Sequence, residues 1–325
     1  MKPKVYVTRL IPEEAVQKLS ENADCRIWEG ELPVPRAVLL REVKTVNALL
    51  SLLTDKIDAA VMDAAPRLRV ISNMAVGFDN VDVGEATKRR ILVCNTPGVL
   101  TDTTADFAFA LLLAAARRVV EGERIVRAGK WKTWGPMILL GRDLHHATLG
   151  IIGLGRIGAE VAKRAKGFDM NVIYYSATRR LDLEKKLGVE FRDLPTLLAT
   201  ADFVSIHCPL VPETYHLLGE EQFKIMKKTA ILVNTARGPI VDPTALYKAL
   251  RNRQIAYAAL DVTEPEPIPP DDPLLILNNI IIVPHIASAS VATRTKMAVT
   301  AVENLLAGLK GEKPPHPVNP EVLPK

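Results

Sequence analysis

Cysteine is scarce in this sequence of 325 residues, and the few cysteines are scattered. Cys25, Cys94 and Cys208 lie far apart in the chain, and none of them belongs to a C-x-x-C pair. An odd and scattered set excludes a disulfide framework and a zinc site built from paired thiolates. We therefore expect reduced thiols, and the sequence predicts no metal site.

Long hydrophobic runs are also lacking. The longest candidate, Phe107 to Ala116, then meets Arg117 and Arg118, and it falls short of the ~20 apolar residues that a membrane span needs. The N-terminus begins Met1-Lys2-Pro3 and turns directly into a strand-like pattern without the apolar core of a signal peptide. We expect a cytoplasmic protein that does not associate with membranes.

Charge of one sign does not gather anywhere, although the formal net charge is +5. Basic residues occur as pairs, such as Lys163-Arg164 and Arg179-Arg180, with acidic residues between the pairs. Binding to nucleic acid needs a basic stripe or patch, so we expect no nucleic-acid partner. A small anionic substrate or cofactor suits the modest surplus better.

Short apolar runs and helical patterns alternate from end to end, which is typical of βαβ units and parallel sheets. The runs of the first third are Val5–Val7, Ala48–Leu52, Leu68–Ser72 and Ile91–Cys94. Six continuous runs follow, at Leu149–Ile152, Asn171–Tyr175, Phe203–Cys208, Ala230–Asn234, Ala256–Asp261 and Ile280–Val283. Continuous runs favour strands that are buried on both faces. The sequence therefore predicts an α/β protein of two doubly wound parallel-sheet domains, with a break near Pro97–Thr101.

Two long helical patterns flank the second series of strands. The first runs from about Thr103 to Ala128, and its residues 107–113 are apolar nearly all round, so we expect it to be covered on most sides. The second runs from about Val291 to Gly308 and is followed by a proline-rich tail.

A glycine-rich motif follows the first run of the second series. Gly153, Gly155 and Gly158 form G-x-G-x-x-G between a predicted strand and a predicted helix. In such a motif the first glycine permits a tight turn, the second lets the backbone approach a pyrophosphate, and the third lets the helix pack on the strand. This context predicts a dinucleotide-binding site.

The residue that distinguishes NAD from NADP is expected at the end of the next strand, about 20 residues further on. Ser176 stands there in place of an acidic residue, and Arg179 and Arg180 follow closely. A neutral hydroxyl with two guanidinium groups nearby suits a 2′-phosphate. We predict NADP(H) as the preferred cofactor, with NAD(H) possible; an exposed basic loop without a ligand is the alternative.

Three polar segments follow the later strands, where ligands bind in an open α/β sheet. They contain Arg237, a carboxylate within residues 260–267, and His285. An arginine clamps an anionic substrate, and a histidine beside a carboxylate is oriented to exchange a proton near neutral pH. Together these residues predict chemistry on a small anionic substrate, although a lone histidine after a strand is more often structural.

Together these segments resemble the D-isomer-specific 2-hydroxyacid dehydrogenases, and within that family the glyoxylate/hydroxypyruvate reductases. The resemblance runs over essentially the whole chain and includes residues 70–80 and 95–102 besides the segments already described. It implies a discontinuous flavodoxin-like substrate domain, residues 1–97 and 290–325, with a Rossmann NAD(P)-binding domain, residues 98–289, inserted in it. It also implies a homodimer formed through the long helix from Thr103.

The resemblance assigns the site residues as follows. Arg237, Glu266 and His285 are expected to be catalytic, and Leu53, Val76, Gly77, Arg237 and His285 to bind the substrate. The expected cofactor contacts are Thr101, Gly153, Leu154, Gly155, Arg156, Ile157, Gly158, Ser176, Ala177, Thr178, Arg179, Arg180, Cys208, Pro209, Thr235, Ala236, Asp261 and Ala287. The remaining histidines, His216 among them, receive no role.

Several functions remain open. The resemblance favours reduction of glyoxylate or hydroxypyruvate to glycolate or D-glycerate with NAD(P)H. The alternatives are a dehydrogenase of another D-2-hydroxy acid, such as D-lactate, a nucleotide-sensing corepressor-like binding protein and a nucleotide-binding domain without catalysis. Formate enzymes pair the histidine with glutamine and phosphite enzymes carry lysine at the position of Val76, so Glu266 and Val76 argue against both.

Overall fold

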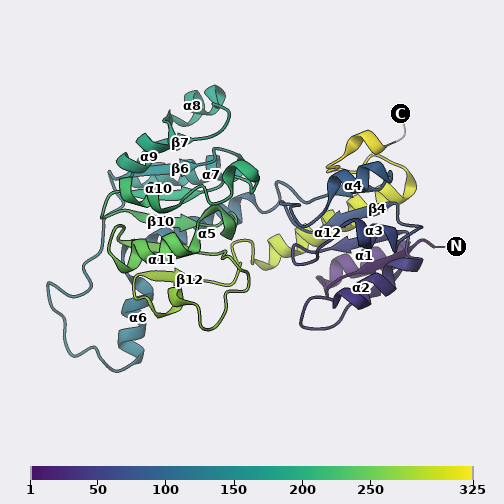
Figure 1. Cartoon of the computed structure of the whole chain (residues 1–325), viewed down its shortest axis with the longest axis horizontal. Coiled ribbons are helices and arrows are strands. Elements are labelled where there is room, and N and C mark those ends of the chain that lie inside the picture. Colours follow the sequence, from purple (N-terminus) through teal and green to yellow (C-terminus); the bar gives the residue numbers. More distant parts are fainter. Residues whose placement is uncertain (1, 324–325) are drawn as a thin grey trace. The chain divides into compact units, whose positions relative to one another are not determined.

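The computed structural model describes residues 2–323, and these divide into two compact units (Figure 1). Unit 1 joins the residues up to Leu100 to those from Ala289 onward, and unit 2 is Thr101–Ser288. The chain therefore leaves unit 1, completes unit 2, and returns. The division is geometric, and the assignment of substrate and cofactor to the two units stays a prediction.

Unit 1 is built on a parallel sheet of five strands in the order β2-β1-β3-β4-β5. The strands are β1 Lys4–Val7, β2 Asp24–Ile27, β3 Ala48–Ser51, β4 Val70–Asn73 and β5 Leu92–Cys94. This order is that of the flavodoxin-like doubly wound fold. Every residue of β3, β4 and β5 is buried, as expected for strands covered by helices on both faces.

The helices of unit 1 include the last helix of the chain. They are α1 Glu13–Asn22, α2 Arg36–Glu42, α3 Ala59–Asp63, α4 Val83–Lys88 and α12 Val291–Lys310. The Ser290 hydroxyl accepts a hydrogen bond from the Thr293 amide where α12 begins, and Gly311 ends the helix with a φ of +79°. Helix α12 packs on α1 and on β3, β4 and β5, so it completes one face of this sheet.

Unit 2 contains a parallel sheet of seven strands in the order β12-β11-β10-β9-β6-β7-β8. Its strands are β6 Thr148–Ile152, β7 Asn171–Tyr175, β8 Glu190–Phe191, β9 Phe203–Ile206, β10 Ile231–Asn234, β11 Tyr257–Leu260 and β12 Ile280–Ile282. Its helices are α5 Thr101–Ala116, α6 Val119–Arg127, α7 Arg156–Ala165, α8 Leu181–Leu187, α9 Leu194–Thr200, α10 Glu220–Ile225 and α11 Pro243–Arg251. If β6 is counted as the first strand, the strand order is that of a Rossmann fold with one extra strand at an edge. Successive strands are added on one side of β6 as far as β8 and on its other side from β9 onward, so the strand order reverses between β6 and β9. The prediction of two parallel doubly wound sheets is confirmed.

The long helix predicted from Thr103 to Ala128 is two helices. Arg118 adopts a left-handed conformation with a φ of +52° and separates α5 from α6. Helix α5 packs against α7, β10 and β11 within its own unit, and Phe109 and Leu112 lie in the core of that unit. Burial inside unit 2 therefore accounts for much of the apolar character of α5.

Two short strands, β2 and β8, lie at sheet edges and were not predicted. Strand β2 alternates exposed and half-buried residues, and β8 has two residues, so neither carries the apolar run of a central strand. No helix in the described part of the chain is both long enough and apolar enough to cross a membrane.

Candidate active site

The glycine-rich turn between β6 and α7 needs two of its glycines for steric reasons. Gly153 has a φ of +97°, and a Cβ on it would lie 2.5 Å from the Cys208 amide nitrogen. A Cβ on Gly158 would lie 2.2 Å from the Gly153 carbonyl oxygen. Without a side chain, Gly153 lies close to the backbone that follows β9, at the position where the strand order reverses. Gly158 likewise lets α7 begin close to Gly153.

Gly155 differs from these two glycines, because a Cβ on it would meet no atom within 4 Å. It is the N-cap residue of α7 and has an ordinary φ of −83°. The first amides of a helix have no acceptor inside the helix and carry partial positive charge. Open space beside such amides fits a dinucleotide pyrophosphate, and Gly155, Arg156 and Ile157 would hold it through their backbone.

Ser176 follows β7 and holds the same turn. Its hydroxyl accepts a hydrogen bond of 2.7 Å from the Leu154 amide. A guanidinium nitrogen of Arg180 lies 3.5 Å from the Leu154 carbonyl oxygen, so Arg180 is beside the turn. Arg179 instead makes two hydrogen bonds, of 2.8 and 2.9 Å, to Glu184. The two arginines that the sequence treats as equivalent therefore have different surroundings.

The loop after β10 carries Arg237 and is fixed by its own side chains. Asn234 accepts a hydrogen bond of 3.0 Å from the Ala236 amide and donates one of 2.8 Å to the Arg237 carbonyl. A Cβ on Gly238 would lie 1.9 Å from the Thr263 carbonyl oxygen. Gly238 thus lets the loops after β10 and β11 touch.

Glu266 and His285 meet from the loops after β11 and β12. A Glu266 carboxylate oxygen lies 2.6 Å from Nδ1 of His285. The second carboxylate oxygen accepts a hydrogen bond of 3.4 Å from the Thr263 amide. Since Glu266 contacts Nδ1, the other ring nitrogen, Nε2, is left to act on a substrate. This is the arrangement of a general acid–base histidine oriented by a carboxylate.

The turn that carries His285 is held by Asp261. The buried Asp261 carboxylate accepts hydrogen bonds of 2.6 Å from the Ile286 amide and 2.9 Å from the Ala287 amide. The Asp261 carbonyl accepts a further one, of 2.9 Å, from the His285 amide. Burial raises the pKa of Asp261. Three hydrogen bonds therefore fix a histidine whose own φ of +53° is unusual for a residue with a side chain.

Residues 109–287 match the family described as D-isomer specific 2-hydroxyacid dehydrogenase, NAD binding domain. The glyoxylate reductase of Korarchaeum cryptofilum is 60% identical over 324 residues, which cover 99% of this chain and 98% of that protein. The chain belongs to the D-isomer-specific 2-hydroxyacid dehydrogenase family. The resemblance noted in the sequence is confirmed, and the protein is an NAD(P)-dependent oxidoreductase.

Solved structures agree with this assignment. A protein from Thermus thermophilus is 50% identical, with a TM-score of 0.92 over 97% of this chain and 99% of that one. The NADPH-dependent glyoxylate/hydroxypyruvate reductase of Sinorhizobium meliloti, solved with NADP and malonate, is 32% identical. Its TM-score is 0.89 over 100% of this chain and 99% of that one.

Three of the predicted substrate residues of this dehydrogenase lie in unit 1, in loops at the carboxyl ends of its strands, whereas Arg237 and His285 lie in unit 2. Leu53 follows β3, and Val76 and Gly77 follow β4. The Val76 carbonyl accepts a hydrogen bond of 2.7 Å from Asn95, and the Gly77 carbonyl accepts one of 3.0 Å from Asn73. The two asparagines therefore fix the backbone of the segment whose amides are predicted to contact the substrate.

The remaining predicted cofactor contacts lie in unit 2 at the carboxyl edge of the sheet or at the start of α5. Thr101 begins α5; Ala177 and Thr178 follow Ser176; Cys208 and Pro209 follow β9; Thr235 and Ala236 follow β10. The Thr235 hydroxyl is buried and has no hydrogen-bond partner among the described residues. Their roles remain predictions.

His216 receives no role from the sequence, and here the structure adds a contact. Nε2 of His216 lies 2.7 Å from a Glu264 carboxylate oxygen. The two residues are 48 positions apart, and no spacing rule links them, so no signal in a single sequence could have paired them. The sequence also carries no signal that Asn95 and Asn73 bind the Val76 and Gly77 carbonyls.

Proposed function

We propose that this dehydrogenase reduces glyoxylate or hydroxypyruvate to glycolate or D-glycerate. The contact of 2.6 Å between Glu266 and Nδ1 of His285 leaves Nε2 for a substrate carbonyl. The observation that carries the choice of substrate is the 60% identity to the glyoxylate reductase of Korarchaeum cryptofilum. One relative of known structure, the S. meliloti enzyme, is described as a glyoxylate/hydroxypyruvate reductase. A dehydrogenase of another D-2-hydroxy acid would use the same pair and is the second candidate.

The chain's own residues divide the work. In unit 2, the guanidinium of Arg237 binds the substrate carboxylate and so orients the carbonyl group. The predicted substrate contacts of unit 1 are the amides of Val76 and Gly77. A bound reduced nicotinamide supplies the hydride. Nε2 of His285 donates a proton to the carbonyl oxygen as negative charge grows there, and Glu266 stabilises the protonated ring and fixes its orientation.

The cofactor preference that we propose is for NADP(H) over NAD(H). Ser176 cannot repel a 2′-phosphate as an acidic residue would, and its hydroxyl is already bonded to the turn. The contacts of the Arg180 guanidinium are long, at 3.4 Å to Asp182 and 3.5 Å to Leu154, whereas Arg179 is tied to Glu184. We therefore assign the contact with the 2′-phosphate to Arg180.

We also propose a homodimer, formed through the helical region from Thr103 that the structure divides into α5 and α6. Helix α6 and the loop after it carry several exposed apolar side chains, since Val126, Trp131, Trp134, Met137 and Leu140 are all more than half exposed. Such a set on one segment is typical of a protein–protein interface. A second copy of the chain is the partner that the family resemblance suggests.

Steady-state kinetics tests the proposed reaction. Glyoxylate, hydroxypyruvate, pyruvate and phenylpyruvate are compared with NADPH and with NADH, and His285→Ala serves as the inactive control. We expect the highest kcat/KM for one of the first two substrates with NADPH. Preference for pyruvate would favour the second candidate, and turnover no higher than that of the control for any keto acid would overturn the proposal.

A further inference from the structure

A second histidine–glutamate pair lies close to the catalytic one. Nε2 of His216 is 2.7 Å from Glu264, and both side chains are about one third exposed or less, at 32% and 26%. The Tyr215 hydroxyl donates a hydrogen bond of 3.3 Å to the same carboxylate, and its ring stacks on His216 with centroids 4.0 Å apart. Nothing in the proposed reaction uses this pair.

The backbone of His216 is fixed to the loop that carries Arg237. The His216 amide donates a hydrogen bond of 2.8 Å to the Pro239 carbonyl, two residues after Arg237. Leu218 extends the contact with a hydrogen bond of 3.1 Å to Ile240. His216 has a φ of +49°, a strained conformation for a residue with a side chain that persists only where the surroundings impose it.

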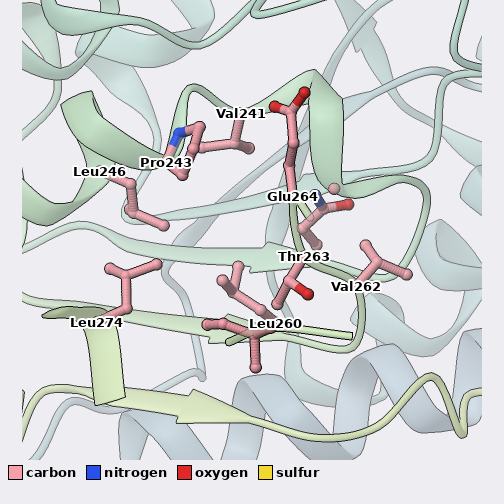
Figure 2. A pocket seen from close by; sticks show the side chains of 11 residues that line it. Val241, Pro243, Leu246, Leu260, Val262, Thr263, Glu264 and Leu274 are labelled. Carbon is pink, nitrogen blue, oxygen red and sulfur yellow. The ribbon is translucent and has the colours of Figure 1, made fainter. Parts of the chain in front are cut away.

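Glu264 lies two residues before Glu266 on the loop after β11. Figure 2 shows its carboxylate directed away from the apolar side chains of Leu246, Leu260 and Leu274, which lie beneath the loop. The cavity among these side chains has a volume of about 10 Å³, no more than a single water molecule needs. The cavity is therefore packing space and not a ligand site, and the polar contacts of the loop lie on its other side.

These contacts connect the two loops that carry Arg237 and Glu266. His216 touches the first through its backbone and the second through its ring, and Gly238 brings the Thr263 backbone against the first loop. We propose that His216 and Glu264 are positioning residues, which hold the loop after β11 so that Glu266 stays against His285. The expected effect on turnover rests on the proposed function, whereas the expected effect on the position of Glu266 does not.

A looser loop has a specific consequence. Without the pair, the Glu266 carboxylate spends less time near Nδ1 of His285, so the protonated imidazole loses electrostatic stabilisation. Misplacement of about 1 Å in a catalytic group costs up to roughly a hundredfold in rate. We expect a loss of kcat with a small change in substrate KM, because neither positioning residue touches the substrate.

The experiment follows the titration of the His285 ring by NMR in the full-length protein, and the pH profile of kcat beside it. His216→Ala and Glu264→Ala are compared with Glu266→Gln, which removes the catalytic carboxylate directly. We expect both alanine variants to move the His285 titration to lower pH by at least half of the Glu266→Gln shift, and to lower kcat by roughly tenfold or more.

Two further variants separate positioning from general loss of structure. His216→Gln keeps a donor toward Glu264 and is expected to restore most of kcat and of the titration. Glu220→Ala breaks an exposed pair with Lys248 in the same unit and is expected to change neither. An unmoved His285 titration in both folded alanine variants would overturn the proposal. Because the NMR titration needs no turnover, that result is distinct from a wild-type protein that reduces no keto acid.

Discussion

At the scale of single residues, the site is concentrated in His285. Its ring contacts Glu266 at 2.6 Å, its amide is bonded to Asp261, and its backbone is left-handed. Left-handed residues other than glycine are uncommon, and they cluster at functional sites where neighbouring contacts impose them. The contact with Glu266 and the backbone that Asp261 holds in place both favour a role in chemistry over a role in packing.

The first prediction concerns this pair. We expect His285→Ala to lower kcat by roughly 10²–10⁴, which is the usual contribution of general acid–base catalysis. We expect Glu266→Gln to move the basic limb of the reduction profile to lower pH, because a neutral amide stabilises the imidazolium less than a carboxylate does. The measurement is kcat for reduction from pH 5 to 10. A basic limb that stays in place in Glu266→Gln would show that the carboxylate is not coupled to His285.

Much of the candidate site could be predicted because of where its residues stand. Arg237, Glu266 and His285 each follow an apolar run, and ligands bind at the carboxyl ends of parallel strands. His216 follows no such rule, because its partner is 48 residues away and the contact exists only after both loops fold. The different contacts of Arg179 and Arg180 also depend on folding, because Glu184 on α8 forms hydrogen bonds with Arg179 only in the folded chain.

At the scale of elements, the turn between β6 and α7 supports a test with matched variants. Gly155→Ala adds a methyl group to open space at an ordinary φ, so we expect an unchanged melting temperature. The same methyl group lies where a pyrophosphate approaches, so we expect the cofactor KM to rise about tenfold or more, which corresponds to ~1.4 kcal/mol of binding.

Gly153→Ala is the contrasting variant. Its methyl group would lie 2.5 Å from the Cys208 amide at a φ of +97°, so we expect a loss of about 2 kcal/mol or more in the free energy of unfolding. Thermal melting and cofactor titration on the two variants separate the effects. Equal melting temperatures for both variants would contradict the assigned role of Gly153.

The end of β9 carries a histidine that should make the stability depend on pH. Burial lowers the pKa of His207 to about 3, whereas an unfolded histidine titrates near 6.5. Below pH ~6.5 the unfolded chain therefore binds a proton at His207, whereas the folded protein does not. As a result, the free energy of unfolding decreases as the pH falls below ~6.5, by up to ~1.4 kcal/mol per pH unit.

Denaturant unfolding of the wild type and of His207→Asn at pH 7, 6 and 5 measures this contribution. We expect the wild type to lose more stability than the variant between pH 7 and pH 5, because the variant has no such proton to take up. Parallel losses in the two proteins would show that His207 is protonated in the folded state.

At the scale of the whole molecule, periodicity alone predicted two parallel sheets, but it did not predict the path between them. Apolar runs identify strands, and they do not say which unit a late helix joins. In the structure Asn304 on α12 donates to the Asn95 carbonyl at 2.8 Å, and Asn319 accepts a hydrogen bond of 2.7 Å from the Val93 amide. These contacts hold the end of the described chain on the sheet of unit 1, and only the family resemblance pointed to that return.

The last prediction concerns assembly. We expect the wild type to sediment as a dimer, because an exposed segment as apolar as the one from α6 through Leu140 is rarely left in water. The double variant Val126→Glu/Met137→Glu puts carboxylates on two side chains that are 57% and 77% exposed, so the folded monomer tolerates them while an apolar interface does not. We therefore expect this variant to sediment as a monomer with an unchanged circular dichroism spectrum. Ile276→Glu alters a side chain of the same unit that is 76% exposed and outside the segment, and it should leave the dimer intact. A wild-type monomer at micromolar concentration, or a double variant that still dimerises, would show that this segment does not hold two copies together.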